Sequence, residues 1–454
     1  MAEKREEEVE LKKVLDVKLL ILQAIGGIFG GGLYGMSGTM IGLTGDFVWA
    51  AMAFLFIPSL FDAFTYMEFA ACYPKMATTY IYMKEGLGGK VGEAISWGLN
   101  MYTTFAAPMS SVFITMTAAG YLQSFFKIFG IPDPGLVAIT FVLWTTAFIL
   151  QCWGVKESVV VGDIMSVMEM SMVLLLITIG FVFPTRSPNY MALPSIGAFA
   201  QTLAMARFAY GGYATPTTYI EETKEPAFQN CWRACMGSLG FTLVGYVAAV
   251  VAMVRMNPPS VIAFAPNPFV ASTQGILGGY APIIFATLGT PAAYNGALFG
   301  MGTRARLIAG MSATGDLPKI LGKWWKRRAT PVPALIVVYL AGLPFVIIGR
   351  FAWLVLATAA TGLVILFMVN LSFIVFNLRG VVPEDKKPWR SPLKIGRFPI
   401  PALLVCAFAA FTAIYQDPNS WVPSFIYMGL AFVLWVLWTL MGKKVSVKKP
   451  KAEE

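Results

Sequence analysis

The stretch Gly26-Gly27-Ile28-Phe29-Gly30-Gly31-Gly32 interrupts the first apolar segment of the chain with five glycines. A second interruption lies in the sixth apolar segment, at Tyr210-Gly211-Gly212-Tyr213 followed by Pro216. Glycine costs about 1 kcal/mol inside a helix, and backbone groups that are freed inside a bilayer need polar partners. Paired interruptions of this kind are typical of transporters, in which a bound solute supplies those partners. The two stretches therefore predict two broken helices that share one binding site.

The composition predicts a membrane protein. Mean hydropathy is +0.68, and 57% of the 454 residues are hydrophobic while 13% are charged, which is more apolar surface than one soluble core can bury. Runs that can cross roughly 30 Å of hydrocarbon predict an all-α polytopic protein with twelve transmembrane helices. Their expected starts are Leu19, Phe47, Gly92, Gly135, Val160, Ser195, Cys231, Tyr280, Val332, Ala352, Pro399 and Trp421.

Membrane topology explains the net charge of +10 better than nucleic-acid binding does, because basic residues concentrate in cytoplasmic loops. No nucleic-acid partner is therefore expected. With a cytoplasmic N-terminus, nearly all basic residues fall on the cytoplasmic side. Those outside are Lys127, Arg186, Arg255 and Arg350. This pattern predicts a multi-pass protein of the cell (plasma or inner) membrane with both termini cytoplasmic. Residues 1–18 are expected to be a cytoplasmic leader and residues 442–454 a basic cytoplasmic tail.

The expected helices fall into two halves that each open with a broken helix. The first half covers residues 19–183 (helices one to five) and the second covers residues 195–378 (helices six to ten). Because five is odd, the second half must insert in the opposite orientation, which gives an inverted repeat around a midplane site. Residues 399–441 then form helices eleven and twelve outside the repeat.

The segment from Gly26 to Tyr34, with Gly38 after it, resembles the first-helix signature of the amino acid/polyamine/organocation (APC) superfamily. Other segments resemble the superfamily in the same order: Tyr66-Met67-Glu68-Phe69-Ala70, Tyr73-Pro74, Tyr80 to Gly88, Phe208 to Gly212, Glu221 to Pro226, Arg306 to Pro318 and Pro388 to Pro392. The resemblance covers nearly the whole chain and implies the five-plus-five inverted repeat and transport of amino acids or related amines. One departure is Ala214, which stands where several members carry an acid, so the gating or cation-binding role of that acid is not carried over.

Two broken helices offer an α-amino acid complementary backbone poles. Free N–H groups at a half-helix N-terminus attract a carboxylate, and freed carbonyls accept from an ammonium group. We expect Gly30, Gly31 and Gly32 to bind the carboxylate and the carbonyls near Ile28 and from Phe208 to Gly211 to bind the ammonium. The expected substrate-binding residues are Ile28, Gly30, Gly31, Gly32, Phe208, Ala209, Tyr210 and Gly211. The rings of Phe208 and Tyr210 are also expected to cover the substrate. The alternative is plain helix packing, since the glycines of the first interruption also fit the small-xxx-small pattern.

Three ionisable residues lie deep in apolar runs: Asp62, Glu169 and Arg207. Each costs at least ~2.5 kcal/mol at the bilayer centre if it is unpaired. Glu169 falls where some proton-coupled relatives in the superfamily carry a fifth-helix lysine, so it is the candidate proton-coupling group. The alternative is a structural ion pair of Glu169 or Asp62 with Arg207. Arg207 is also a candidate for contact with an acidic substrate side chain.

The sequence therefore predicts a secondary active transporter that imports amino acids by alternating access, with the proton as coupling ion. Exchange, sodium symport (through hydroxyls of Thr287 and Thr290), transport of polyamines or other organic amines, and substrate sensing without transport stay open. An enzyme is not expected, because there is no histidine, HExxH, GxSxG or phosphate loop. No cofactor is expected, and five cysteines without CxxC spacing predict no metal site. The lipid bilayer is the remaining partner.

Overall fold

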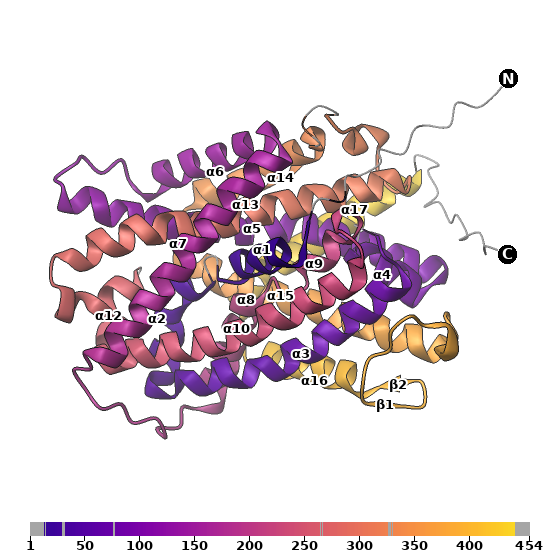
Figure 1. Cartoon of the computed structure of the whole chain (residues 1–454). Helices are drawn as coiled ribbons and strands as arrows, with labels where there is room; N and C mark the ends of the chain where they lie inside the picture. The colour runs from indigo at the N-terminus through magenta and orange to yellow at the C-terminus, as the bar shows by residue number, and fades with distance from the viewer. Residues whose placement is uncertain are drawn as a thin grey trace.

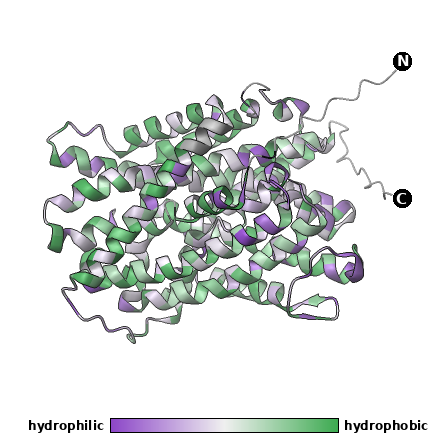
Figure 2. Cartoon of the chain, viewed as in Figure 1, coloured by the Kyte–Doolittle hydropathy of each residue, from purple (hydrophilic) through white to green (hydrophobic). Residues whose placement is uncertain are grey.

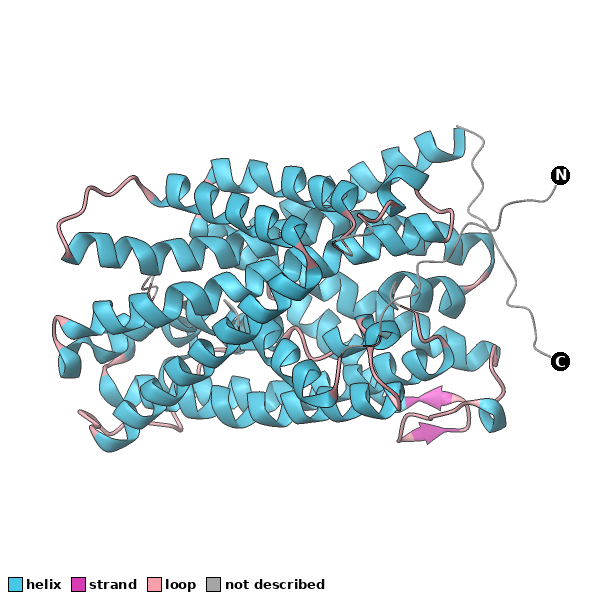
Figure 3. Ribbon diagram, turned by 45° about the horizontal axis from the view of Figure 1, so that its top comes forward, coloured by secondary structure: helices cyan, strands magenta, loops and turns pink. Residues whose placement is uncertain are grey.

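The computed structural model describes residues 13, 15–29, 32–75, 78–263, 265, 267–325, 328 and 330–440, with the backbone alone for residues 155–160. Within this part the chain is a bundle of helices that run mostly along one direction (Figures 1 and 3). Gly30 and Gly31, most of the expected leader and the expected tail lie outside the described residues.

The helices and strands are α1 (Val17–Phe29), α2 (Gly32–Thr44), α3 (Val48–Cys72), α4 (Thr78–Leu87), α5 (Gly89–Ile128), α6 (Leu136–Trp153), α7 (Val155–Val182), α8 (Ile196–Tyr210), α9 (Thr215–Thr218), α10 (Ala227–Met256), α11 (Pro259–Ile262), α12 (Pro268–Leu277), α13 (Tyr280–Ala313), α14 (Val332–Ile348), α15 (Phe351–Arg379), β1 (Lys394–Ile395), β2 (Phe398–Pro399), α16 (Ile400–Ile414) and α17 (Val422–Leu440). Strands β1 and β2 form an antiparallel hairpin.

The observed helices follow the apolar runs closely. Every expected start lies within five residues of the first residue of an observed helix. The first expected helix is in two pieces, α1 and α2, and so is the sixth, α8 and α9. Ser195 starts α8 by accepting a hydrogen bond from the Ala198 N–H, and Pro216 occupies the first turn of α9, where its missing N–H costs nothing.

Length and composition make this a multi-pass membrane protein. In the described residues, seven helical stretches are long and apolar enough to cross a membrane, and Val332–Ile348 and Ile400–Ile414 are shorter apolar helices. Figure 2 shows mainly hydrophobic helices, with hydrophilic residues more frequent towards the end of the bundle that holds the β1–β2 hairpin.

The interrupted helices lie inside the bundle. Helix α1 packs against α7, α10 and α13, and α2 packs against α8. The long helices α5 and α13 pack along each other, with large α5 side chains such as Trp97, Phe113 and Tyr121 fully buried. Close packing on every side is what allows non-helical backbone at membrane depth.

A buried ionic cluster fastens the loop between α15 and α16. Glu68, fully buried near the end of α3, accepts hydrogen bonds at 2.7 Å from Lys387, from Lys394 and from the backbone N–H of Ser391. Burial raises the pKa of Glu384, but its hydrogen bond with Lys387 and the charge of Lys394 outweigh that effect and hold the pKa below its ordinary value. The loop is therefore anchored to the helices rather than loosely attached.

A short backbone pairing ties the residues before α1 to those after α9. The Leu15 N–H donates to the Glu222 carbonyl at 3.1 Å, and the Lys224 N–H donates to the Leu15 carbonyl at 2.8 Å. Lys13 adds an ion pair with Glu225 at 2.5 Å. The start of α1, the earlier piece of the first interrupted helix, is thus linked directly to the end of α9, the later piece of the second.

Candidate functional site

The two interruptions meet backbone to backbone. A Cβ atom added at Gly212 would lie 2.9 Å from the backbone of Gly27 and Ile28, and Gly212 has φ +131°, a conformation that favours glycine. A Cβ atom added at Gly32 would lie 2.5 Å from the Cα of Ala209. Glycine is therefore needed at both positions for this close approach.

Two carbonyls freed by the interruptions converge on one hydroxyl. Tyr246 of α10 places its hydroxyl 2.6 Å from the Ile28 carbonyl oxygen and 2.9 Å from the Ala209 carbonyl oxygen. A hydroxyl carries a single proton, so it cannot satisfy both carbonyls fully, and the pair keeps capacity to accept from a cation. The carbonyl of Phe208 instead accepts from the Gly211 N–H at 2.9 Å.

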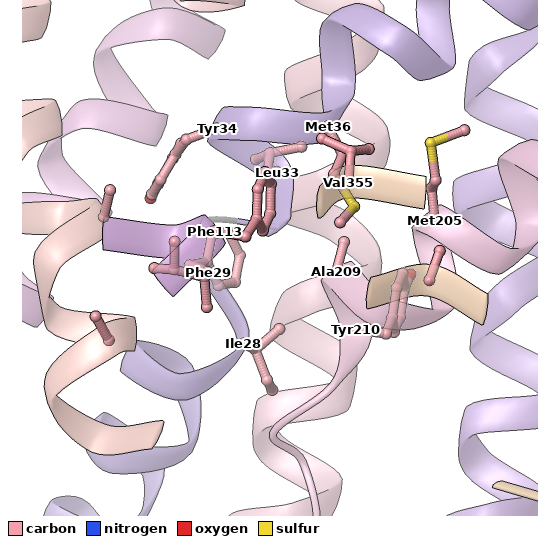
Figure 4. Close-up of a cluster of buried hydrophobic side chains, with 14 of the residues drawn as sticks. Ile28, Phe29, Leu33, Tyr34, Met36, Phe113, Met205, Ala209, Tyr210 and Val355 are labelled. Atoms are coloured by element: carbon pink, nitrogen blue, oxygen red, sulfur yellow. The ribbon is translucent and has the colours of Figure 1, made fainter. Parts of the chain in front are cut away.

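Figure 4 shows the aromatic side chains of Phe29, Tyr34, Phe113 and Tyr210 in the same buried cluster as Ile28 and Ala209. Phe208 is partly exposed, and its ring meets that of Phe113 edge-on with centroids 6.0 Å apart. Tyr210 is fully buried and donates its hydroxyl to the Met52 carbonyl at 2.9 Å. Of the two rings expected to cover a substrate, Phe208 lies next to α5, whereas Tyr210 packs against α3 and α10.

Glu169 lies beside the first interruption, where α7 approaches α2 and α13. Its Oε1 accepts from the Tyr34 hydroxyl at 3.3 Å, and its buried Oε2 has no hydrogen-bond partner in the described part of the chain. Asn295 of α13 donates to Ser166 Oγ at 2.9 Å. Ser166 in turn lies so close to Gly26 that a Cβ atom there would be 2.5 Å from its Oγ. The group is buried, polar and incompletely hydrogen-bonded.

Asp62 lies beside the second interruption. Its Oδ1 accepts from Asn370 of α15 at 2.5 Å, and its Oδ2 accepts from the Tyr213 hydroxyl. Arg207 lies against α15, with Nη1 3.1 Å from where a Cβ atom on Gly362 would be. Within the described residues, Arg207 forms no ion pair with Asp62 or Glu169.

The hydroxyls near the middle of α13 differ in their surroundings. Thr287 is exposed and donates to the Ile283 carbonyl at 2.8 Å, whereas the buried Thr290 Oγ1 has no partner among the described residues. The same residues contain no group of three or more His, Cys, Asp or Glu side chains that could hold a metal ion.

The interruptions, Asp62, Glu169 and Arg207 were predicted from the sequence as parts of the candidate site, whereas Tyr246, Asn295 and Asn370 were not. Each missed residue is a single polar side chain in an apolar helix, far from its partner in the sequence. A polar residue inside a transmembrane segment is the one signal that could have indicated them.

Comparison with known proteins identifies the family of this chain. Residues 15–438 match the family described as amino acid permease. The human large neutral amino acids transporter small subunit 2 is 27% identical over 90% of this chain and 77% of its own length. The branched-chain amino acid permease BcaP of Bacillus subtilis is 30% identical over 72% of this chain and 73% of its own. The human cystine/glutamate transporter is 24% identical over 95% and 87%.

These relatives are transporters rather than enzymes, and the family match extends over nearly the whole chain. The chain belongs to the amino acid permease family of the APC superfamily.

Proposed function

We propose that this protein is a secondary active transporter that moves amino acids across a cell membrane by alternating access. The proposal includes twelve transmembrane helices, with an inverted repeat of residues 19–183 and 195–378, and cytoplasmic termini. The observation that carries it is the convergence of the Ile28 and Ala209 carbonyls where the two interrupted helices meet. Freed backbone at membrane depth is tolerated where it lines a solute site.

In this proposal the amino acid lies between the two interruptions. Its ammonium group donates to the carbonyls of Ile28 and Ala209, and its carboxylate accepts from N–H groups in the stretch Gly30 to Gly32. Phe208 borders the substrate on the side of α5. Charge-assisted hydrogen bonds of this kind contribute about 1.5 to 3 kcal/mol each, so the backbone poles alone support binding without an ionised side chain.

Glu169 is the proposed proton-coupling group. The polar side chains near its carboxyl group are Tyr34, Asn295 and Tyr246, and no lysine or arginine of the described residues pairs with it. A buried carboxylate without a cation is costly, so a proton is the simplest way to neutralise it. Tyr34 belongs to α2, so protonation of Glu169 would change a hydrogen bond made by an interrupted helix.

Exchange is the second candidate, because the name of the human cystine/glutamate relative joins two substrates. A sodium ion near Thr290 is the alternative coupling ion, since that hydroxyl is buried without a partner in the described chain.

The test is uptake by purified protein in liposomes, with and without an inward proton gradient. We expect the gradient to drive accumulation by the wild type, and Glu169→Gln to remove gradient dependence while substrate counterflow continues. Asp163→Asn is the matched control, because Asp163 is another carboxylate on α7 and lies off the face formed by Gly162, Ser166 and Glu169. Equal gradient dependence in Glu169→Gln would refute the role of Glu169. Counterflow without any gradient-driven uptake by the wild type would favour exchange.

A further inference from the structure

Two arginines of the bundle interior have no carboxylate partner. Within the described chain, Arg207 of α8 is partly exposed and forms no hydrogen bond or ion pair. Arg304 of α13 donates Nη1 to Thr103 Oγ1 at 2.7 Å, and its buried Nε has no partner there. By contrast, Arg306, two residues further on, pairs with Glu222 at 3.5 Å.

The two guanidinium groups contact neighbouring residues where α5 meets α15. Arg304 donates to Thr103 of α5, and the adjacent Tyr102 donates its hydroxyl to the Thr361 carbonyl of α15 at 3.2 Å. Arg207 lies against Gly362, the next residue of α15.

The phenol of Tyr66 on α3 lies in electrostatic range of both arginines and of Asp62. The oxygens of Asp62 are already hydrogen-bonded to Asn370 and Tyr213. Two cations therefore face one carboxylate, which leaves a positive charge uncompensated. An unpaired arginine inside a bundle of membrane-spanning helices is costly and is typical of a solute path.

The arginines also come from different parts of the bundle. Helix α8 packs against α2, α3 and α15, whereas α13 packs against α5, α7 and α14. Arg207 directly precedes Phe208, which borders the second interruption. An anion held by both arginines would therefore connect an interrupted helix with the long α5–α13 pair.

We propose that Arg207 and Arg304 form a subsite for an anionic side chain of the substrate, so that the transported class is amino acids with a side-chain carboxylate or sulfonate. The inference rests on the proposed function, in which the backbone poles bind the α-carboxylate and the α-ammonium. Guanidinium groups suit the second anion because they donate two parallel hydrogen bonds to a planar carboxylate. The substrate then supplies the negative charge that the site lacks.

The test compares glutamate with glutamine, and aspartate with asparagine, in binding and uptake by the reconstituted protein. These pairs have nearly the same shape and differ in side-chain charge. We expect the wild type to bind the acidic member at least tenfold more tightly. Arg207→Gln and Arg304→Gln should each reduce that preference at least tenfold, and Arg207→Lys and Arg304→Lys should restore part of it. Arg255→Gln, at a partly buried arginine that donates to the Gly180 carbonyl, is the matched control and should keep the preference.

Two results would overturn the subsite and leave the proposed function standing. One is uptake of neutral amino acids together with a ratio of acidic to neutral amino acid uptake that neither Arg207→Gln nor Arg304→Gln changes. The other is uptake of neutral amino acids that requires chloride and stops when gluconate replaces it. If both glutamine variants lose this chloride requirement, the arginines bind a free inorganic anion rather than a substrate side chain. Absence of binding or uptake of any amino acid by folded wild-type protein would instead reject the proposed function together with the subsite.

Discussion

At the scale of single residues, Tyr246 joins the two interrupted helices through one oxygen atom. Its ring is fully buried and meets Phe29 and Tyr210 edge-on, with centroids 4.7 and 5.3 Å away. Packing therefore fixes the hydroxyl between the Ile28 and Ala209 carbonyls independently of any ligand. This hydroxyl keeps two like dipoles close together, an arrangement that would otherwise be repulsive.

Removing that hydroxyl should weaken substrate binding without unfolding the protein. In Tyr246→Phe the ring contacts remain, but the two carbonyls lose the group that holds them together. A loss of about 1 to 1.4 kcal/mol, or roughly five- to tenfold in affinity, is expected. Binding of the best amino acid substrate by calorimetry measures it. Tyr339→Phe is the control, since its hydroxyl contacts Thr145 at 3.0 Å between α14 and α6. Unchanged affinity in Tyr246→Phe would mean that these carbonyls do not bind the ammonium group.

The residues that are easiest to predict from this sequence are those that are energetically unfavourable in an apolar membrane helix. Glycine repeats and charges stand out in apolar helices, so the interruptions, Asp62, Glu169 and Arg207 were identifiable. Their partners were not, because the Asp62–Asn370 bond spans 308 positions and the Tyr34–Glu169 bond spans 135. Such pairings depend on how helices rotate and pack, which local patterns do not encode.

At the scale of helices, the short helices differ from the long ones in how well the sequence predicts them. The long helices were predictable because an apolar run must be about twenty residues to cross a bilayer. The short helices α4, α9, α11 and α12 were not predicted individually, since four to ten residues form a helix only with support from tertiary contacts. One of them, α9, follows the second interruption and is linked to the residues before α1 through Leu15 and Thr223.

In the proposed transport cycle, we expect this linkage to make α1 and α9 move together. The close approach of α2 and α8 on the other side of the interruptions is a separate contact, made at Gly32 and Ala209. In the proposed mechanism, alternating access loosens one of these contacts while the other stays closed.

Gly32→Ala should block transport by keeping α2 and α8 apart. The added methyl would lie 2.5 Å from the Ala209 Cα, and backbone cannot move aside as a flexible side chain can. We expect uptake to fall at least a hundredfold while the protein still reaches the membrane. Gly240→Ala on α10 is the control, because a Cβ atom there meets nothing within 4 Å. Wild-type uptake by Gly32→Ala would show that this contact is not part of the transport cycle.

At the scale of the whole molecule, a bundle of apolar helices places its backbone poles and uncompensated charges in the interior. Ionic contacts such as Lys387–Glu68 and Lys84–Asp316 are paired within the protein and need no ligand. The Ile28 and Ala209 carbonyls, Glu169 Oε2 and the two arginines are among the groups whose hydrogen-bonding requirements the described residues leave incomplete. A zwitterionic solute with its coupling ion is the simplest occupant that satisfies them.

The most direct measurement is thermal stabilisation of the purified protein by each of the twenty amino acids and by polyamines, repeated with analogues that lack the α-amino or the α-carboxyl group. Ligand at a hundredfold excess over its Kd stabilises the folded state by about 2.7 kcal/mol, which shifts the melting temperature measurably. We predict stabilisation by at least one amino acid, and loss of that stabilisation when the α-amino or the α-carboxyl group is removed. Stabilisation by polyamines alone, or equal stabilisation by both truncated analogues, would contradict it.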